Sequence, residues 1–177
     1  MEPIHIFKLK LNKNEIQALK TLLSKPSNRR NKSLKSIFDR LDGEDEITLY
    51  IDGAADLHSK TAGIGGVIYR NKDELFSFSE YLDDATNNEA EYTALIRGIE
   101  HLIALSQFSV QIYSDSELVV KQINGEYRVK NQRMQNLYQQ AMQLLNKLDQ
   151  YSVTHILRDK NTVADKLANV GRAMGKK

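Results

Sequence analysis

The segment Ile47-Thr48-Leu49-Tyr50-Ile51-Asp52-Gly53 is the most informative one for the architecture of this chain. Apolar and polar side chains alternate along it, and β-branched and aromatic residues dominate, which predicts a strand with one buried face. The strand ends on Asp52, and we expect Gly53 to turn the chain away. The segment Val110-Gln111-Ile112-Tyr113-Ser114-Asp115 repeats the pattern, again with an aspartate two residues after a tyrosine. If the two strands are parallel neighbours, both carboxylates leave the sheet at the same edge.

Around these two segments the chain alternates between strand and helix patterns. A period of two predicts strands, and a period near 3.6 predicts helices. The order is βββαβααβα, a three-stranded antiparallel meander followed by parallel additions. This predicts an α/β fold with a five-stranded mixed sheet, in which the second helical region is split. Beyond the two segments, the expected elements are a loop at 54–63, strands at 64–70, 74–82 and 152–157, and helices at 88–105, 116–124, 131–148 and from 162.

The N-terminal quarter of the chain differs from the rest. We expect residues 1–45 to form a basic extension or small helical module with a linker, and residues 46–177 to form the main domain. Residues 1–41 hold ten Lys or Arg and three Asp or Glu, whereas the remaining residues hold fifteen and twenty. This asymmetry indicates a polyanionic partner; a solvated arm that aids solubility is the alternative. The expected local elements are a strand at 4–11, helices at 14–23 and 33–41, and an acidic linker at 42–46.

Composition excludes several classes of protein. The 177 residues include 41% hydrophobic and 27% charged residues, as in ordinary soluble globular proteins. No apolar run approaches the roughly 18 residues of a membrane span, and the N-terminus lacks the pattern of a signal peptide. The absence of cysteine excludes disulfides, thiolate catalysis and zinc–cysteine sites. It also fits a reducing compartment, so we expect a cytoplasmic protein without membrane contact.

Four acids are candidates for one site. Asp52 and Asp115 end strands, Glu91 lies near the start of the helix expected at 88–105, and Asp165 lies on the last helix. Two carboxylates about 4 Å apart repel by around 4 kcal/mol at an effective dielectric of 20, so such a cluster takes up protons or binds divalent cations. Mg²⁺ suits an oxygen-only ligand set, and a pair of such ions can hydrolyse a phosphodiester. By spacing alone, each acid could instead be a helix cap or a surface charge.

Several segments resemble, in the same order, those of the type 1 ribonuclease H family, and the resemblance runs from about Ile47 to Met174. It implies the ribonuclease H fold and endonucleolytic cleavage of the RNA strand of RNA–DNA hybrids, with two Mg²⁺ ions, or Mn²⁺, as cofactors. It also implies that the four acids are the metal-binding and catalytic residues. The matching segments are Tyr50-Ile51-Asp52-Gly53, Thr86-Asn87-Asn88-Glu89-Ala90-Glu91, Ser114-Asp115-Ser116, Arg158-Asp159-Lys160-Asn161-Thr162-Val163-Ala164-Asp165 and, similar to the archaeal and plant-like short-helix variant, 124–131.

The resemblance further implies nucleic-acid contacts. Thr86, Asn87 and Asn88 match positions that touch the DNA phosphate and minor-groove bases, and their hydroxyl and amide groups suit both. Asn88 could also cap the helix. Arg158, at a strand end, is a candidate for a phosphate or product contact. Asn161 is expected to line the exit side of the site, with a simple turn residue as the alternative.

The chain also departs from the family pattern. Some members carry a mobile histidine on a loop before the last acid, and His155 precedes Asp165 by ten residues. Because His155 falls within a predicted strand, we interpret it as structural. His58 could face substrate or only solvent. Glu117 replaces an amide that often reads the substrate, which weakens the expectation of a minor-groove contact there.

Two other functions are compatible with these patterns. One is a nucleic-acid-binding module that has lost turnover, although a complete acid set argues against it. The other is a nuclease that prefers double-stranded or structured RNA. The expected partner is therefore an RNA–DNA hybrid, with double-stranded RNA as a second candidate, and no obligate protein partner is evident.

Overall fold

The computed structural model describes residues 12–35, 37, 46–56 and 58–175. The chain divides into two compact units, Met1–Asp45 and Glu46–Lys177. Within the described residues, no helix is both long and apolar enough to span a membrane.

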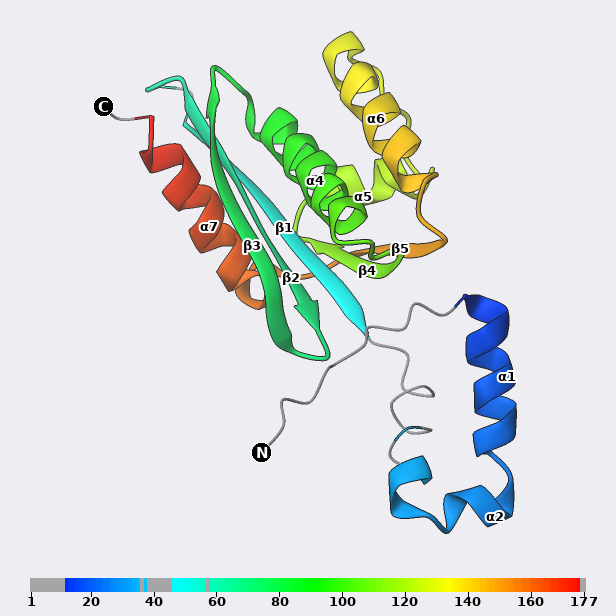
Figure 1. Cartoon of the computed structure of the whole chain (residues 1–177). Helices are drawn as coiled ribbons and strands as arrows, with labels where there is room; N and C mark the ends of the chain where they lie inside the picture. The colour runs from blue at the N-terminus through cyan, green and yellow to red at the C-terminus, as the bar shows by residue number, and fades with distance from the viewer. Residues whose placement is uncertain (1–11, 36, 38–45, 57, 176–177) are drawn as a thin grey trace. The chain divides into compact units, whose positions relative to one another are not determined.

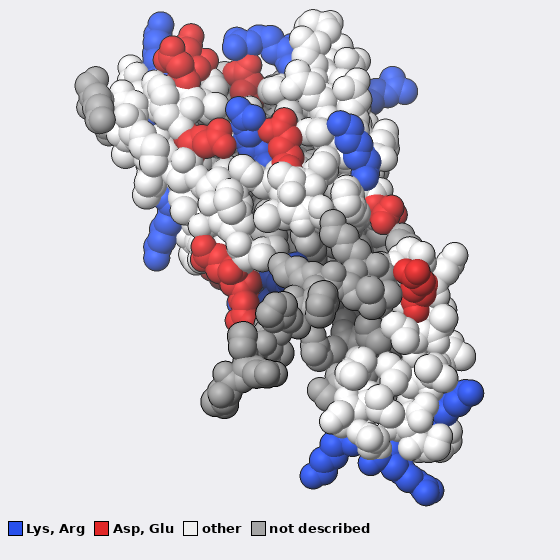
Figure 2. All heavy atoms as spheres, viewed as in Figure 1, with Lys and Arg blue, Asp and Glu red and all other residues white. Residues whose placement is uncertain are grey.

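The N-terminal unit begins its described part with helix α1 (Lys13–Leu23), which is followed by α2 (Pro26–Arg29). Asn12 caps α1 through a capping box in which Asn12 and Glu15 bond to each other's backbone N–H at 3.0 and 2.7 Å. Around α2 the charges visible in Figure 2 are basic. Parts of three predicted segments lie outside the described residues. They are the strand at 4–11, residue 36 and positions 38–41 of the helix at 33–41, and residues 42–45 of the linker. Exposed basic side chains of this unit include Lys25, Arg30, Lys32 and Lys35.

The C-terminal unit is a five-stranded sheet of order β3-β2-β1-β4-β5, with helices on both faces (Figure 1). The pairs β1–β2 and β2–β3 are antiparallel, and β1–β4 and β4–β5 are parallel. The predicted mixed α/β sheet is therefore confirmed. Its elements are β1 (Ile47–Asp56), β2 (Thr61–Arg70), β3 (Asp73–Asp83), α4 (Asn87–Ala104), β4 (Ser109–Ser114), α5 (Glu117–Ile123), α6 (Gln132–Leu145), β5 (Gln150–His155), the 3-10 turn η1 (Arg158–Lys160) and α7 (Thr162–Ala173).

Helix α4 packs on one face of the sheet, against β1 and β2, and α7 packs on the opposite face, against β1, β2 and β3 (Figure 1). The apolar residues of β1, including Leu49 and Ile51, point toward α4 and are fully buried. Residues of α4 at helical spacing fill the space above them, as their period predicted. Fully buried members of this α4 stripe are Tyr92, Leu95, Ile99 and Leu102.

Gly53 does not turn the chain, so the loop predicted at 54–63 is wrong. Strand β1 continues to Asp56, and Gly53 pairs with Ile64 of β2. A Cβ atom at position 53 would lie 2.4 Å from the carbonyl carbon of Ala90 and from the backbone nitrogen of Glu91. The glycine is therefore required because α4 approaches β1 closely. The actual turn lies between Asp56 and Thr61.

Candidate active site

The carboxyl ends of β1 and β4 bring Asp52 and Asp115 together. The strands are parallel neighbours, with Ile51 beside Ser114, so the residues that follow lie at the same edge. Helix α4 supplies the third acid, Glu91, because its start packs against Gly53. Oxygen atoms of Asp52, Glu91 and Asp115 all lie within 4.8 Å of one another. The predicted convergence of these acids is thus present in the structure.

Burial dominates the electrostatics of this cluster. Asp52 is 3% exposed and Glu91 is 5% exposed. The pKa of Asp52 is raised to about 7, mainly by burial and to a lesser extent by the charges of Asp115 and Asp165. The positive charge of Arg158 partly offsets this rise. Burial, followed by the charges of Asp52 and Asp115, raises the pKa of Glu91 to about 9. A metal-free cluster therefore retains protons at neutral pH.

These residues fit a divalent cation. The ligand set contains carboxylate oxygens from three residues whose spacing lets one ion contact them all. The Oε2 atom of Glu91 is buried and has no hydrogen-bond partner. A buried acceptor without a partner is costly in isolation, and a bound cation would satisfy it. The backbone N–H of Gly53 faces the Glu91 carboxylate and lowers its pKa, against the larger raising by burial.

Asp165 stands outside this close group. It lies in the first turn of α7, and its Oδ1 atom accepts a hydrogen bond from Nη2 of Arg158 at 2.5 Å. The Arg158 side chain is 75% exposed, whereas that of Asp165 is 26% exposed. Asp165 still acts on the cluster, since its charge contributes to the raised pKa of Asp52. The structure therefore joins three of the four predicted acids directly and holds the fourth nearby through Arg158.

Asn161 has a role in the structure that its sequence position did not reveal. Its side chain is 1% exposed. The Nδ2 atom donates to the Ile51 carbonyl oxygen at 2.9 Å and to Oδ1 of Asp115 at 2.8 Å. Asn161 thereby joins the start of α7 to the ends of both central strands and fixes the Asp115 carboxylate. Both hydrogen bonds that the Nδ2 atom donates go to acceptors within the protein. A contact of Asn161 with nucleic acid therefore stays a prediction.

Residues 50–171 match the family described as reverse transcriptase-like. The chain belongs to this family. It is 32% identical to the bifunctional protein Rv2228c of Mycobacterium tuberculosis over 70% of this chain and 35% of that protein. It is 32% identical to ribonuclease HI of Halobacterium salinarum over 68% of this chain and 61% of that protein. The chain thus spans only about a third to three fifths of the length of these relatives.

Solved structures also resemble the C-terminal unit. The structure of LC11-RNase H1 in complex with an RNA/DNA hybrid matches with a TM-score of 0.69 and 32% identity, covering 75% of this chain and all of that one. The C-terminal unit is therefore a ribonuclease H-like domain of the reverse transcriptase-like family, and the predicted resemblance is confirmed.

The start of α4 in this ribonuclease H-like domain presents the predicted contact residues to solvent. Thr86, Asn87 and Asn88 are all exposed. Thr86, rather than Asn88, caps the helix, and its Oγ1 donates to Oε2 of Glu89 at 2.8 Å. Nε of Arg133 on α6 lies 2.8 Å from Oε1 of the same glutamate. The start of α4 is therefore accessible, and the Glu89 carboxylate links it to both Thr86 and Arg133. Its contact with nucleic acid stays a prediction.

The two histidines considered above lie at the surface of the domain. His155 ends β5, in agreement with its predicted place in a strand, and its side chain is exposed. His58 is exposed in the β1–β2 turn, where its backbone N–H donates to Oδ1 of Asp56 at 3.0 Å. Glu117 forms an ion pair with Lys121 at 2.6 Å. The side chains of His58 and His155 are thus open to solvent.

Proposed function

We propose that this protein is a metal-dependent endoribonuclease that cleaves the RNA strand of RNA–DNA hybrids and leaves 5′-phosphate and 3′-hydroxyl ends. The convergence of the carboxylates of the buried Asp52 and Glu91 and the half-buried Asp115 carries this proposal. It is supported by the likeness of the domain to ribonuclease HI and to a ribonuclease H1 that was solved with an RNA/DNA hybrid.

The chemistry follows from the acid set. Asp52 and Asp115 would be the inner metal ligands. Glu91 would bind one ion and help position the RNA, and Asp165 would bind the second ion. Two Mg²⁺ ions, with Mn²⁺ as the alternative, would neutralise the acids, activate the attacking water and stabilise the leaving oxygen of the phosphodiester. Releasing Asp165 from Arg158 would make its carboxylate available and free the guanidinium for a phosphate.

The remaining residues of the site position these groups. Asn161 fixes the Asp115 carboxylate through the hydrogen bond that its Nδ2 atom donates. The exposed Thr86, Asn87 and Asn88 at the start of α4 are suited to hold the DNA strand through phosphate and base edges. Discrimination of RNA from DNA would then depend on contacts to 2′-hydroxyls near the acids.

The test is cleavage of a labelled RNA–DNA hybrid by the wild type and Asp52→Asn, with Mg²⁺ or Mn²⁺ and with EDTA. We expect RNA-strand cutting that requires metal and falls to background in the variant. Duplex RNA and duplex DNA, assayed in parallel, separate the hybrid nuclease from a nuclease that prefers duplex RNA. Tight hybrid binding without cutting in either metal would contradict the proposal and indicate a binding module.

A further inference from the structure

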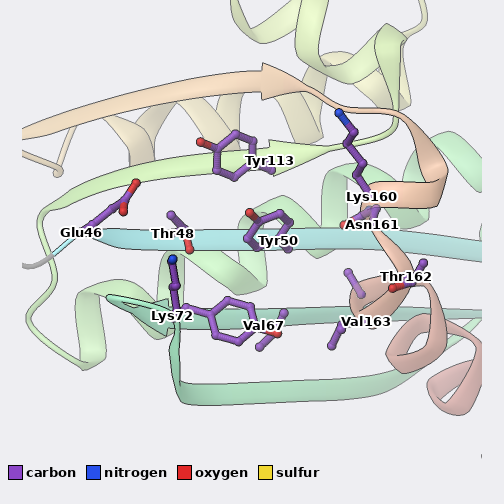
Figure 3. Close-up of a pocket in the computed structure, with 12 residues that line it drawn as sticks. Glu46, Thr48, Tyr50, Val67, Lys72, Tyr113, Lys160, Asn161, Thr162 and Val163 are labelled. Carbon is purple, nitrogen blue, oxygen red and sulfur yellow. The ribbon is translucent and has the colours of Figure 1, made fainter.

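A cavity of about 430 Å³ lies on the face of the sheet opposite α4 (Figure 3). Side chains on β1 alternate between faces, so Thr48 and Tyr50 point away from the buried Leu49 and Ile51. The start of α7 closes one side of the cavity. Its volume is in the range of sites that hold a small organic ligand.

Three tyrosines form the floor of this cavity. Tyr50 of β1 pairs in register with Tyr113 of β4, and their rings stack with centroids 4.9 Å apart and an angle of 23° between planes. Tyr69 of β2 meets Tyr50 edge-on, with centroids 5.9 Å apart. All three side chains are half-buried and anchored on neighbouring strands. The floor is therefore a fixed aromatic surface, which costs little side-chain entropy when a planar ligand binds.

Cationic side chains lie at both ends of this floor. Figure 3 shows Lys72 beside Thr48 and Lys160 beside Asn161. Both lysines are exposed, so their ammonium groups can reach an anion held over the rings. Glu46 also lines the cavity near Lys72 and offers an acceptor for an amino group. The cavity thus combines aromatic rings, cations and one carboxylate acceptor.

We propose that this cavity binds an unpaired nucleotide of a single-stranded segment, with its base against the tyrosines and its phosphates at Lys72 and Lys160. This inference rests on the proposed function, because it assigns the occupant to a strand that flanks the cleaved hybrid. Base–aromatic stacking beside basic groups is how proteins hold single strands without sequence preference. A paired base is excluded since its faces are already stacked within the duplex.

The cavity is connected to the acids through Asn161. This residue lines the cavity and donates its side-chain hydrogen bond to Asp115. An unpaired segment held over the tyrosines therefore ends next to the catalytic cluster. The cavity would favour hybrids that continue into a single strand over hybrids with blunt ends.

The test uses the full chain and two substitutions away from the acids. Tyr69→Leu removes one ring, and Lys72→Gly removes one ammonium at a position whose φ of 83° suits glycine. Lys147→Gln, at an exposed lysine outside the cavity lining, is the control for charge. Binding of a fluorescent single-stranded oligonucleotide is measured in EDTA, so that no cleavage is needed. We expect each cavity variant to weaken binding at least about fivefold and the control to match the wild type.

Cleavage provides the second measurement. Hybrids with and without a single-stranded RNA overhang are compared, and we expect the overhang to lower the wild-type KM at least about fivefold. Both cavity variants should lose this advantage and keep the wild-type rate on the blunt hybrid, which also shows that they fold. Equal binding by wild type and cavity variants, or an advantage that the variants retain, would overturn the inference. If the wild type cuts no hybrid, but both cavity variants still bind the single strand more weakly than the wild type, the proposed function is refuted and the cavity assignment stands.

Discussion

Replacing Asp52 by asparagine should stabilise the metal-free protein at alkaline pH while abolishing its activity. The side chain is nearly isosteric, so packing is kept, and the change removes one carboxylate from a buried cluster. Burial and the neighbouring Asp115 raise the pKa of Asp52 from 3.8 to about 7. The folded protein therefore holds this proton more tightly than the unfolded chain does.

The sign and size of the effect follow from this shift. The stability that the raised pKa provides is fully present below about pH 4 and is lost as the pH rises through about 7. About three pKa units at 1.36 kcal/mol each give an upper limit of about 4 kcal/mol. We expect about 2 kcal/mol at pH 8, because relaxation and water entry weaken charge repulsion in real sites. The asparagine variant should therefore exceed the wild type by that amount at pH 8 and match it near pH 4.

The assay is urea unfolding in EDTA, followed by circular dichroism, at several pH values from about 4 to about 8. A second series contains Mg²⁺ in place of EDTA. Bound metal stabilises the folded state by about 2.7 kcal/mol at a hundredfold excess over Kd. The wild type should gain this stability, and the variant should gain much less. In Mg²⁺ at pH 8 the wild type should therefore have the larger unfolding free energy, the reverse of the result in EDTA.

Asp73→Asn is the matched control, since it removes an exposed carboxylate at the start of β3. Its unfolding free energy should follow that of the wild type across the series. A free-energy difference between wild type and Asp52→Asn that stays constant from about pH 4 to about pH 8 would refute the assigned electrostatics.

Three further predictions concern the supports of the site and the N-terminal arm. Gly53→Ala should destabilise the domain by about 1–3 kcal/mol in urea unfolding and lower activity, because the new methyl group meets the α4 backbone; unchanged stability would show that α4 can shift freely. Asn161→Asp should make stability fall more steeply with pH than in the wild type, by about 2 kcal/mol at pH 8, since it sets a buried carboxylate beside Asp115; parallel pH profiles would contradict this. Deleting residues 1–41 should weaken hybrid binding and flatten its salt dependence, because ten basic residues are lost, but leave metal binding intact; an unaltered salt slope would disprove a role for the arm.

Much of the fold could be predicted because its signals are local. The period of two around Leu49 and Ile51 and the helical period of α4 each depend on residues close in sequence, and the structure confirms them. The repeated strand ending on an aspartate also predicted the meeting of Asp52 and Asp115, because parallel neighbours end at the same edge.

Gly53 shows where local reasoning failed. A glycine after an apolar strand is typical of a turn, yet here the strand continues to Asp56. The reason for the glycine is the α4 backbone, which packs against position 53. That requirement cannot be read from the neighbours of a residue in the sequence, since it arises only when the helix is docked.

The order of strands and helices, the residue types of the site and the edge of the sheet where Asp52 and Asp115 lie all follow from local patterns in the chain. The groups that act on these two acids are brought to them by packing between segments far apart in the chain. Asn161 bonds to a carbonyl 110 residues away, Glu91 owes its raised pKa to its burial where α4 docks on β1, and Asp165 is held by Arg158 instead of joining the close group. Burial and contacts between distant segments set the charge and the orientation of each acid, because both depend on the packed surroundings of the carboxylate.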